Sequence, residues 1–356
     1  MALPSSGQIS ASQIANEFGY TNGSETRLGS YRTTNGQGNF PVSFGALQFN
    51  SIDAQTGGTV PTSGQIKFSD FYSTRLQQVV NFYGSGKGGS RLVAKDRYNA
   101  NLSGDVNVIG NYRTRPNNSS GTKVHIHVNQ QIGSEKTRVE HCALRTGSWD
   151  SSTTLQVDVG GSGRIGGAGG DGGRGSDSSN SNETSGRGGD GTSGLGVQYN
   201  PTTVNVASGG VITAGFGGGG GGGGAYDTDK EGARTASGGG GGGGAGIPAG
   251  AGGAAGFNAG VNGQPGNAGS ISEGGTPGEG GNNDGEAVAG DGGTGGEASD
   301  SADSGVTGQG GEGSTYSPGP AGSPGAAIRR NTGFTVNVNI ASSGSVNGSQ
   351  NATTVL

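Results

Sequence analysis

The sequence predicts a mostly β and irregular fold. Small N-terminal repeat modules precede a β-rich connector and a C-terminal glycine-rich polyglycine II helix bundle flanked by short strands. Three observations support this prediction: a nine-residue motif that occurs twice, short segments that alternate apolar and polar residues, and a concentration of glycine in 160–325. The expected divisions are 1–78, 79–159, 160–340 and a tail of 341–356.

The N-terminal motif reads PSSGQISAS in 4–12 and PTSGQIKFS in 61–69. Ser10 or Ser12 can cap a short helix that stops at Gly19, and Ser69 can cap another after the second copy. Such small modules are either local turns or docking elements for a larger assembly. The candidate docking side chains are the apolar ones of both copies: Ile9, Ile14, Phe18, Ile66, Phe68 and Phe71.

Alternating residues in 106–109, 124–128 and 155–159 predict half-buried strands. His125 and His127 lie at the outward positions of the second segment. Such a pair could supply nitrogen ligands to an octahedral metal on the threefold axis of a trimer. Strand alternation alone explains the pattern, so metal binding is the minor hypothesis and no cofactor is expected.

The glycine-rich region holds 63 of the 85 glycines and carries 16 acidic against 5 basic residues. Nucleic acid is therefore an unsuitable ligand, because phosphate binding needs a basic surface. The whole chain has no apolar run long enough for a membrane span and no basic, apolar start typical of a signal peptide. Cys142 is the only cysteine, which excludes an intrachain disulfide.

Two interpretations of the glycine tracts compete. Glycine-rich linkers are usually disordered, because they bury too little apolar surface to offset the loss of conformational entropy. The ordered alternative is a bundle of extended helices with three residues per turn, whose outward N–H and C=O groups bond to neighbouring helices. Flanking strands and short tract spacing favour order. On that interpretation 217–224 and 238–244 are central rods, and the inserts between tracts are turns.

The order of strand, glycine tracts and closing strand resembles the glycine-rich tip domains of phage tail-fibre adhesins. The start MALPSSGQIS also looks like that of many tailed-phage proteins, and the matching segments are 160–173, 204–224, 238–248 and 322–328. The resemblance implies a polyglycine II tip whose loops contact the bacterial surface. Because aromatic side chains suit binding sites, the candidate receptor-binding residues are Tyr226, Asp227, Asp229, Lys230, Glu231, Arg234, Phe257, Asn258 and Tyr316.

The expected function is that of a virion tail-fibre or tail-tip adhesin, assembled in the host cytoplasm, that recognises a host outer-membrane protein or glycan. Other tail, baseplate or fibre proteins are expected partners, and the chain is a homotrimer or a monomer. An enzyme is not expected, because the sequence shows no recognisable Ser/His/Asp arrangement. The apolar repeats that a large β-helical depolymerase would need are also missing. The alternatives are a purely structural tail part, as spacer or assembly clamp, and an ice-binding protein.

Overall fold

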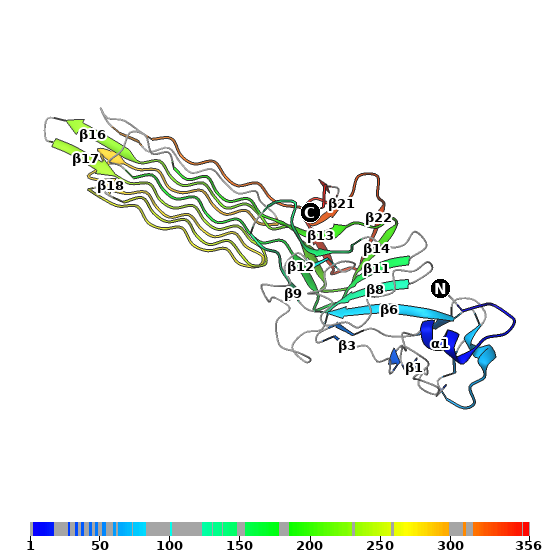
Figure 1. The fold of residues 1–356 in the computed structure, drawn as a ribbon. Helices are drawn as coiled ribbons and strands as arrows, with labels where there is room; N and C mark the ends of the chain where they lie inside the picture. The colour runs from blue at the N-terminus through cyan, green and yellow to red at the C-terminus, as the bar shows by residue number, and fades with distance from the viewer. Residues whose placement is uncertain are drawn as a thin grey trace.

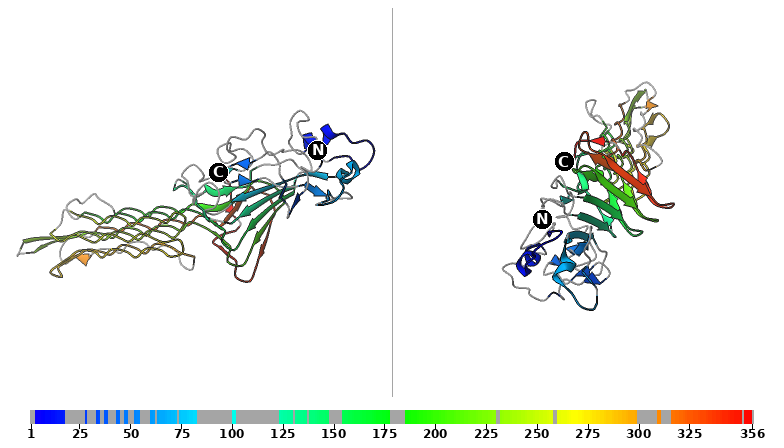
Figure 2. Two further views of the ribbon diagram at one scale, coloured as in Figure 1. Left: turned by 90° about the horizontal axis from the view of Figure 1, so that it is seen from below. Right: turned by 90° about the vertical axis from the view of Figure 1, so that its right-hand side faces the viewer.

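A computed structural model shows an elongated molecule with sheets at one end and a long glycine-rich projection at the other (Figures 1 and 2). It describes residues 3–17, 28, 33–34, 37–38, 43–44, 47–48, 52–54, 60–61, 63–72, 74–82, 100–101, 123–129, 131–136, 138–147, 154–177, 185–229, 232–257, 260–298, 309–310, 316–350 and 352–355. Helix is almost absent from this part of the chain, which confirms the mostly β and irregular class. None of the described helices is long and apolar enough to cross a membrane.

Three sheets form the wide end of the molecule. All their pairings are parallel except that of β5 with β6. The six-stranded sheet has the order β22 (Val336–Ile340), β14 (Thr202–Val206), β11 (Thr154–Val159), β8 (Lys123–Val128), β6 (Thr74–Phe82) and β5 (Ile52–Ala54). The four-stranded sheet has the order β23 (Ser345–Asn347), β15 (Val211–Thr213), β12 (Arg164–Gly166) and β9 (Gln131–Ile132). The five-stranded sheet has the order β24 (Ala352–Thr353), β21 (Ile328–Arg330), β13 (Ser193–Val197), β10 (Cys142–Arg145) and β7 (Ala100–Asn101).

The chain visits the three sheets in a fixed order, from the six-stranded to the four-stranded to the five-stranded sheet. From β8 onward it completes this circuit four times and so builds a three-sided coil of stacked strands. The strands expected at 124–128 and 155–159 are confirmed as β8 and β11. The segment 106–109 lies outside the described residues.

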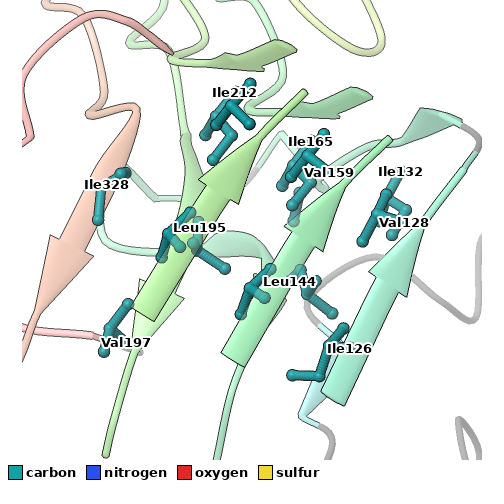
Figure 3. Close-up of a cluster of buried hydrophobic side chains, with 14 of the residues drawn as sticks. Ile126, Val128, Ile132, Leu144, Val159, Ile165, Leu195, Val197, Ile212 and Ile328 are labelled. Atoms are coloured by element: carbon teal, nitrogen blue, oxygen red, sulfur yellow. The ribbon is translucent and has the colours of Figure 1, made fainter. Parts of the chain in front are cut away.

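The core of the coil consists of inward residues in register on successive turns. Ile126, Val157 and Val204 form one such row, and all three are fully buried. Figure 3 shows how side chains from the three sheets meet in this core. The expectation that the repeats of a β-helical core are missing was therefore wrong. Each turn contributes only a few apolar residues, and long insertions interrupt two of the turns between the four-stranded and the five-stranded sheet.

The projection consists of two insertions into the coil. Residues 167–192 connect β12 to β13, and residues 214–327 connect β15 to β21, so both leave the four-stranded sheet and return to the five-stranded sheet. Their long runs lie side by side along the projection (Figure 1). Most of these runs belong to no β-ladder, yet their backbone groups bond between runs.

The segment 237–246 lies at the centre of these runs. Its N–H groups donate in a cycle of three residues, so every third residue reaches the same neighbour. The acceptor segments are 170–176, 290–296 and 261–270. Its carbonyl groups accept from three further segments, 216–222, 250–256 and 275–281. Six neighbours thus surround one backbone, which explains why nearly all of it is glycine: a Cβ on Gly242 would lie 1.9 Å from the Gly275 oxygen.

Two small antiparallel sheets close the far end of the projection. β16 (Ala225–Asp229) and β17 (Gly232–Ala236) form a hairpin, and β18 (Asn282–Asn283), β19 (Ala287–Val288) and β20 (Gln309–Gly310) form the second sheet. Four buried alanines pack between them: Ala225, Ala236, Ala287 and Ala289. With side chains this small, the two sheets approach each other closely.

The N-terminal residues lie at the opposite end of the molecule (Figures 1 and 2). Here α1 (Ala11–Glu17) and the 3-10 helix η3 (Phe68–Phe71) contribute to a small core of Leu3, Ile14, Ala15, Val60 and Phe71. The paired strands β1 (Thr33–Thr34) with β2 (Gln37–Gly38), and β3 (Ser43–Phe44) with β4 (Leu47–Gln48), complete the described elements.

The helix caps of this region match the expectation in one copy of the motif and differ in the other. The Gln13 N–H donates to Ser10 Oγ at 3.1 Å, so Ser10 caps α1 as expected. Ser69 does not cap the second helix, because η3 begins earlier and its N-cap is Lys67. The Lys67 N–H donates to Asp70 Oδ2 at 2.8 Å, which stabilises this earlier start. Gly19 lies outside the described residues.

Candidate functional site

Five parts of the chain meet at the far end of the projection. The Ser185 hydroxyl donates to the Gly222 carbonyl at 2.8 Å, and the Tyr316 N–H donates to the Gly224 carbonyl at 3.1 Å. The Gly260 N–H donates to Thr235 Oγ1 at 2.7 Å. The parts that meet are 176–177 with 185, 225–236, 257 with 260, 282–288, and 309–310 with 316. The sequence could not predict which inserts share an end, because glycine tracts carry no order.

The strands of the β16–β17 hairpin contain four of the nine residues proposed from sequence, namely Tyr226, Asp227, Asp229 and Arg234. Tyr226 is half-buried, and Asp227 is buried opposite Arg234 in the hairpin register. Arg234 Nη1 forms an ion pair with Glu286 Oε2 of the neighbouring β18–β19 turn. Arg234 therefore joins the two small sheets. Lys230 and Glu231 lie outside the described residues, as does the side chain of Asp229.

A second group surrounds Phe257, whose side chain is 52 % exposed. The Arg174 guanidinium lies over the Phe257 ring, with its carbon 4.8 Å from the ring centroid. Arg174 Nη2 also donates to Asp177 Oδ1 at 2.6 Å, and the same oxygen accepts the Phe257 N–H at 2.8 Å. These contacts fix the aromatic ring while leaving half of it open to solvent. Asn258 lies outside the described residues.

Tyr316 is half-buried beside the end of a central glycine tract. A Cβ added to Gly224 would lie 3.2 Å from Tyr316 Cδ2, which shows how closely the ring approaches this backbone. Tyr226, Phe257 and Tyr316 thus lie on chain segments that meet at the same end, although no described contact joins their rings.

Sequence reasoning missed Arg174, Asp177 and Glu286. The sequence did contain a signal for Arg174 and Asp177. An arginine is followed three residues later by an aspartate both in 174–177 (RGSD) and in 187–190 (RGGD). Residues three apart share a face of a helix with three residues per turn. Arg187 Nη2 donates to Asp190 Oδ1 at 2.6 Å, and this guanidinium lowers the pKa of the Asp190 carboxyl. Asp177 is buried and paired with Arg174.

Several acidic side chains of the projection accept backbone N–H groups from a neighbouring run. Asp171 Oδ1 accepts the Ala251 N–H at 2.7 Å, and Asp190 Oδ1 accepts the Ser323 N–H at 2.7 Å. Asp291 Oδ1 accepts the Gly280 N–H at 2.8 Å. At the edge of the bundle no further glycine run is needed to accept these N–H groups, because the carboxylates accept them instead.

The predicted docking residues differ in how deeply they are buried. Ile14 and Phe71 are fully buried in the N-terminal core, and Ile9 and Ile66 pack against it. Phe68 is 43 % exposed, which leaves its ring accessible to a partner. Phe18 lies outside the described residues. A docking role stays a prediction for the whole set.

His125 and His127 lie in β8, paired in register with Gln156 and Asp158 of β11. Their side chains are not among those described. Within the described residues no group of three or more His, Cys, Asp or Glu side chains is placed to hold a metal. The metal hypothesis for this pair stays a prediction.

Comparison with known proteins gives one family and one solved structure. A family model described as "Phage tail fibre adhesin Gp38" matches residues 90–351. The solved structure is described as the crystal structure of the gp37-gp38 adhesin tip complex of the bacteriophage S16 long tail fiber. It is 17 % identical over 97 % of this chain and 94 % of that chain, with a TM-score of 0.33, too low to support a conclusion. No curated protein matches the chain significantly.

Proposed function

We propose, from the premise that this chain belongs to the phage tail fibre adhesin Gp38 family, that its projection is a rigid polyglycine II bundle presenting receptor-binding loops. Family membership makes the chain a phage tail fibre adhesin, which attaches the virion to its host. The predictions of an adhesin instead of an enzyme, and of a location in the virion tail, are confirmed by this membership.

The hydrogen-bond pattern of 237–246 supports the polyglycine II assignment. A three-residue cycle with six neighbours is what a threefold helix without internal hydrogen bonds requires. Each bond contributes about 0.5–1.5 kcal/mol net, so a dense lattice can stabilise a region that has little apolar core. Such a lattice holds the far-end loops in fixed relative positions, which lowers the entropy cost of binding.

Phe257 is the residue we propose as the centre of the receptor contact, with Tyr226 and Tyr316 nearby. An exposed aromatic ring held by Arg174 and Asp177 combines large contact area with little remaining freedom. Two of the described carboxylates at this end, on Asp177 and Glu286, are each paired with an arginine, which reduces repulsion from an anionic cell surface. The proposed receptor is an outer-membrane protein or a surface glycan.

The opposite end is the one we propose for attachment to the tail fibre. The described residues of 1–78 lie far from the loops, and Phe68 offers an exposed aromatic side chain there. The proposed partner is a fibre protein of the gp37 kind, as in the gp37-gp38 complex of bacteriophage S16. We propose 79–159 as the connector and 160–340 as the tip. However, the sheets cross that boundary, because β22 shares a sheet with β8.

The observation that carries this function is the grouping of the candidate loops at one end of a hydrogen-bonded bundle. The test adds the purified full chain in excess to host bacteria and counts the phage particles that stay unadsorbed. Phe257→Ala should weaken the block at least tenfold. Ile271→Ala is the matched control, because Ile271 is 44 % exposed but lies at the coil end of the bundle.

Equal blocking by the wild type and Phe257→Ala would remove Phe257 from the site. A correctly folded wild-type chain that neither binds cells nor blocks adsorption would contradict the proposed mode of attachment, and the purely structural alternative would then gain support. The ice-binding alternative gains no support from the family match.

A further inference from the structure

A row of polar residues crosses the outer face of the six-stranded sheet. Asp158 of β11, Asn205 of β14 and Asn339 of β22 occupy directly paired positions. The backbone positions in register with Asp158 on the next two strands are those of His127 in β8 and Asn81 in β6. Neighbouring strands are about 4.8 Å apart, so the polar residues of the row follow one another at about that spacing.

The described side chains of this row form a chain of hydrogen bonds. Asn339 Nδ2 donates to Asn205 Oδ1 at 2.8 Å, and Asn205 Nδ2 donates to Asp158 Oδ1 at 2.7 Å. Gln156 Nε2 donates to the same Asp158 oxygen at 2.7 Å. These bonds fix the amide orientations. An amide group has two N–H donors and two lone pairs on oxygen, so Asn205 keeps capacity to donate and accept once more.

A groove of about 390 Å³ runs beside this row at the ends of the strands. The last turns of the coil contribute equivalent triplets to its lining, namely 158–160, 205–207 and 339–341, together with Asn129. Gly160, Ala207 and Ala341 are small and leave room at the corner, while Ile340 is 47 % exposed beside it. Asp158 is the only charged residue among the described residues that line the groove.

We propose that this groove binds a neutral, hydroxyl-rich glycan, as a second contact with the cell surface. A sugar hydroxyl can both donate and accept a hydrogen bond. The Asn205 amide retains one free donor and one free acceptor position, so it can bond such a hydroxyl in either direction. A polymer of repeating units matches a row that repeats once per strand. A single carboxylate disfavours anionic polysaccharides. The groove lies on the coil, so it is separate from the loops at the far end of the projection.

The test measures binding of the full chain to three neutral probes: maltohexaose, dextran and a purified neutral O-polysaccharide. Asn205→Ala removes the middle of the row, and Asn339→Ala removes its exposed end, where little folding cost is expected. Asn337→Ala is the matched control, because Asn337 is exposed on the same strand and the same face but does not line the groove. Melting temperatures check that every variant is folded.

We expect at least one probe to bind the wild type, and both groove variants to lose tenfold or more in affinity while Asn337→Ala retains it. Phe257→Ala should bind the glycan normally, which separates this site from the proposed receptor contact. The proposal is overturned if no probe binds the wild type. It is equally overturned if the groove variants bind as the wild type does, or if Asn337→Ala loses as much affinity as they do.

Discussion

The coil and the projection are stabilised in opposite ways. The coil has an ordinary apolar core in which Ile126, Leu195 and Ile165 are fully buried. The projection has few large apolar side chains among its described residues, and its interior around Gly242 is backbone bonded to backbone. The comparison teaches that a long rigid arm can be built without a hydrophobic core, provided that every buried N–H and C=O has a partner.

The largest effect should come from one added methyl group in the projection. Gly242→Ala places a Cβ 1.9 Å from the Gly275 oxygen, and the surrounding runs cannot move without breaking bonds. We expect a loss of about 3 kcal/mol in unfolding free energy, the upper part of the usual range for overpacking. Thermal and denaturant unfolding measure it.

Asn262→Ala is the control for this variant, because Asn262 is exposed on an outer run of the same bundle. A loss below about 0.5 kcal/mol is expected there, as for ordinary surface changes. If Gly242→Ala were as mild as Asn262→Ala, the lattice of bonded glycine runs would not be the source of the stability of the projection.

A smaller effect should follow from one methyl group removed in the coil. Ile126→Val leaves a small void in the core and should cost about 1 kcal/mol. Burial raises the pKa of the Cys142 thiol to about 12, so labelling of this thiol at pH 8 reports opening of the coil. Ile126→Val should increase the labelling rate by the factor that the lost stability sets, about fivefold for 1 kcal/mol.

The comparison between the two regions becomes sharper if Gly242→Ala is labelled at Cys142 as slowly as the wild type. That result is expected when the projection opens while the coil stays closed. If the two regions unfold as one unit, Gly242→Ala should instead accelerate labelling at least as much as Ile126→Val does, because its loss of stability is larger.

The smallest effect concerns the surface of the projection. The pKa of Asp190 is lowered in the folded state, mainly by Arg187, so the contribution of its carboxylate is present above the unfolded value of about 3.8 and disappears as the pH falls through the folded pKa. Asp190→Asn should therefore cost less than about 1 kcal/mol at pH 7, since the pair is partly exposed.

The difference in unfolding free energy between the wild type and Asp190→Asn should vanish in acid below the folded pKa. A series of unfolding curves between pH 7 and pH 2 measures it. A difference that grew towards low pH would show that the sign of this linkage is wrong.

The sequence predicted local elements better than their arrangement. Strands such as β8 and β11 alternate clearly, so their existence could be read from the residues. The coil could not, because parallel strands that pair in space are separated by insertions of unequal length. At the far end, Tyr226 and Phe257 were found as aromatic residues in inserts. Arg174 and Glu286 were missed because their importance lies in contacts between runs that glycine spacing does not order.

The most direct test of the account is hydroxyl-radical footprinting of the full chain, free and bound to outer-membrane vesicles of the host. The account predicts protection of Tyr226, Phe257 and Tyr316 at the far end of the projection, with Phe68 at the opposite end unchanged. Protection of Phe68 without any at the far end would contradict the claim that the glycine-rich bundle presents the receptor-binding surface.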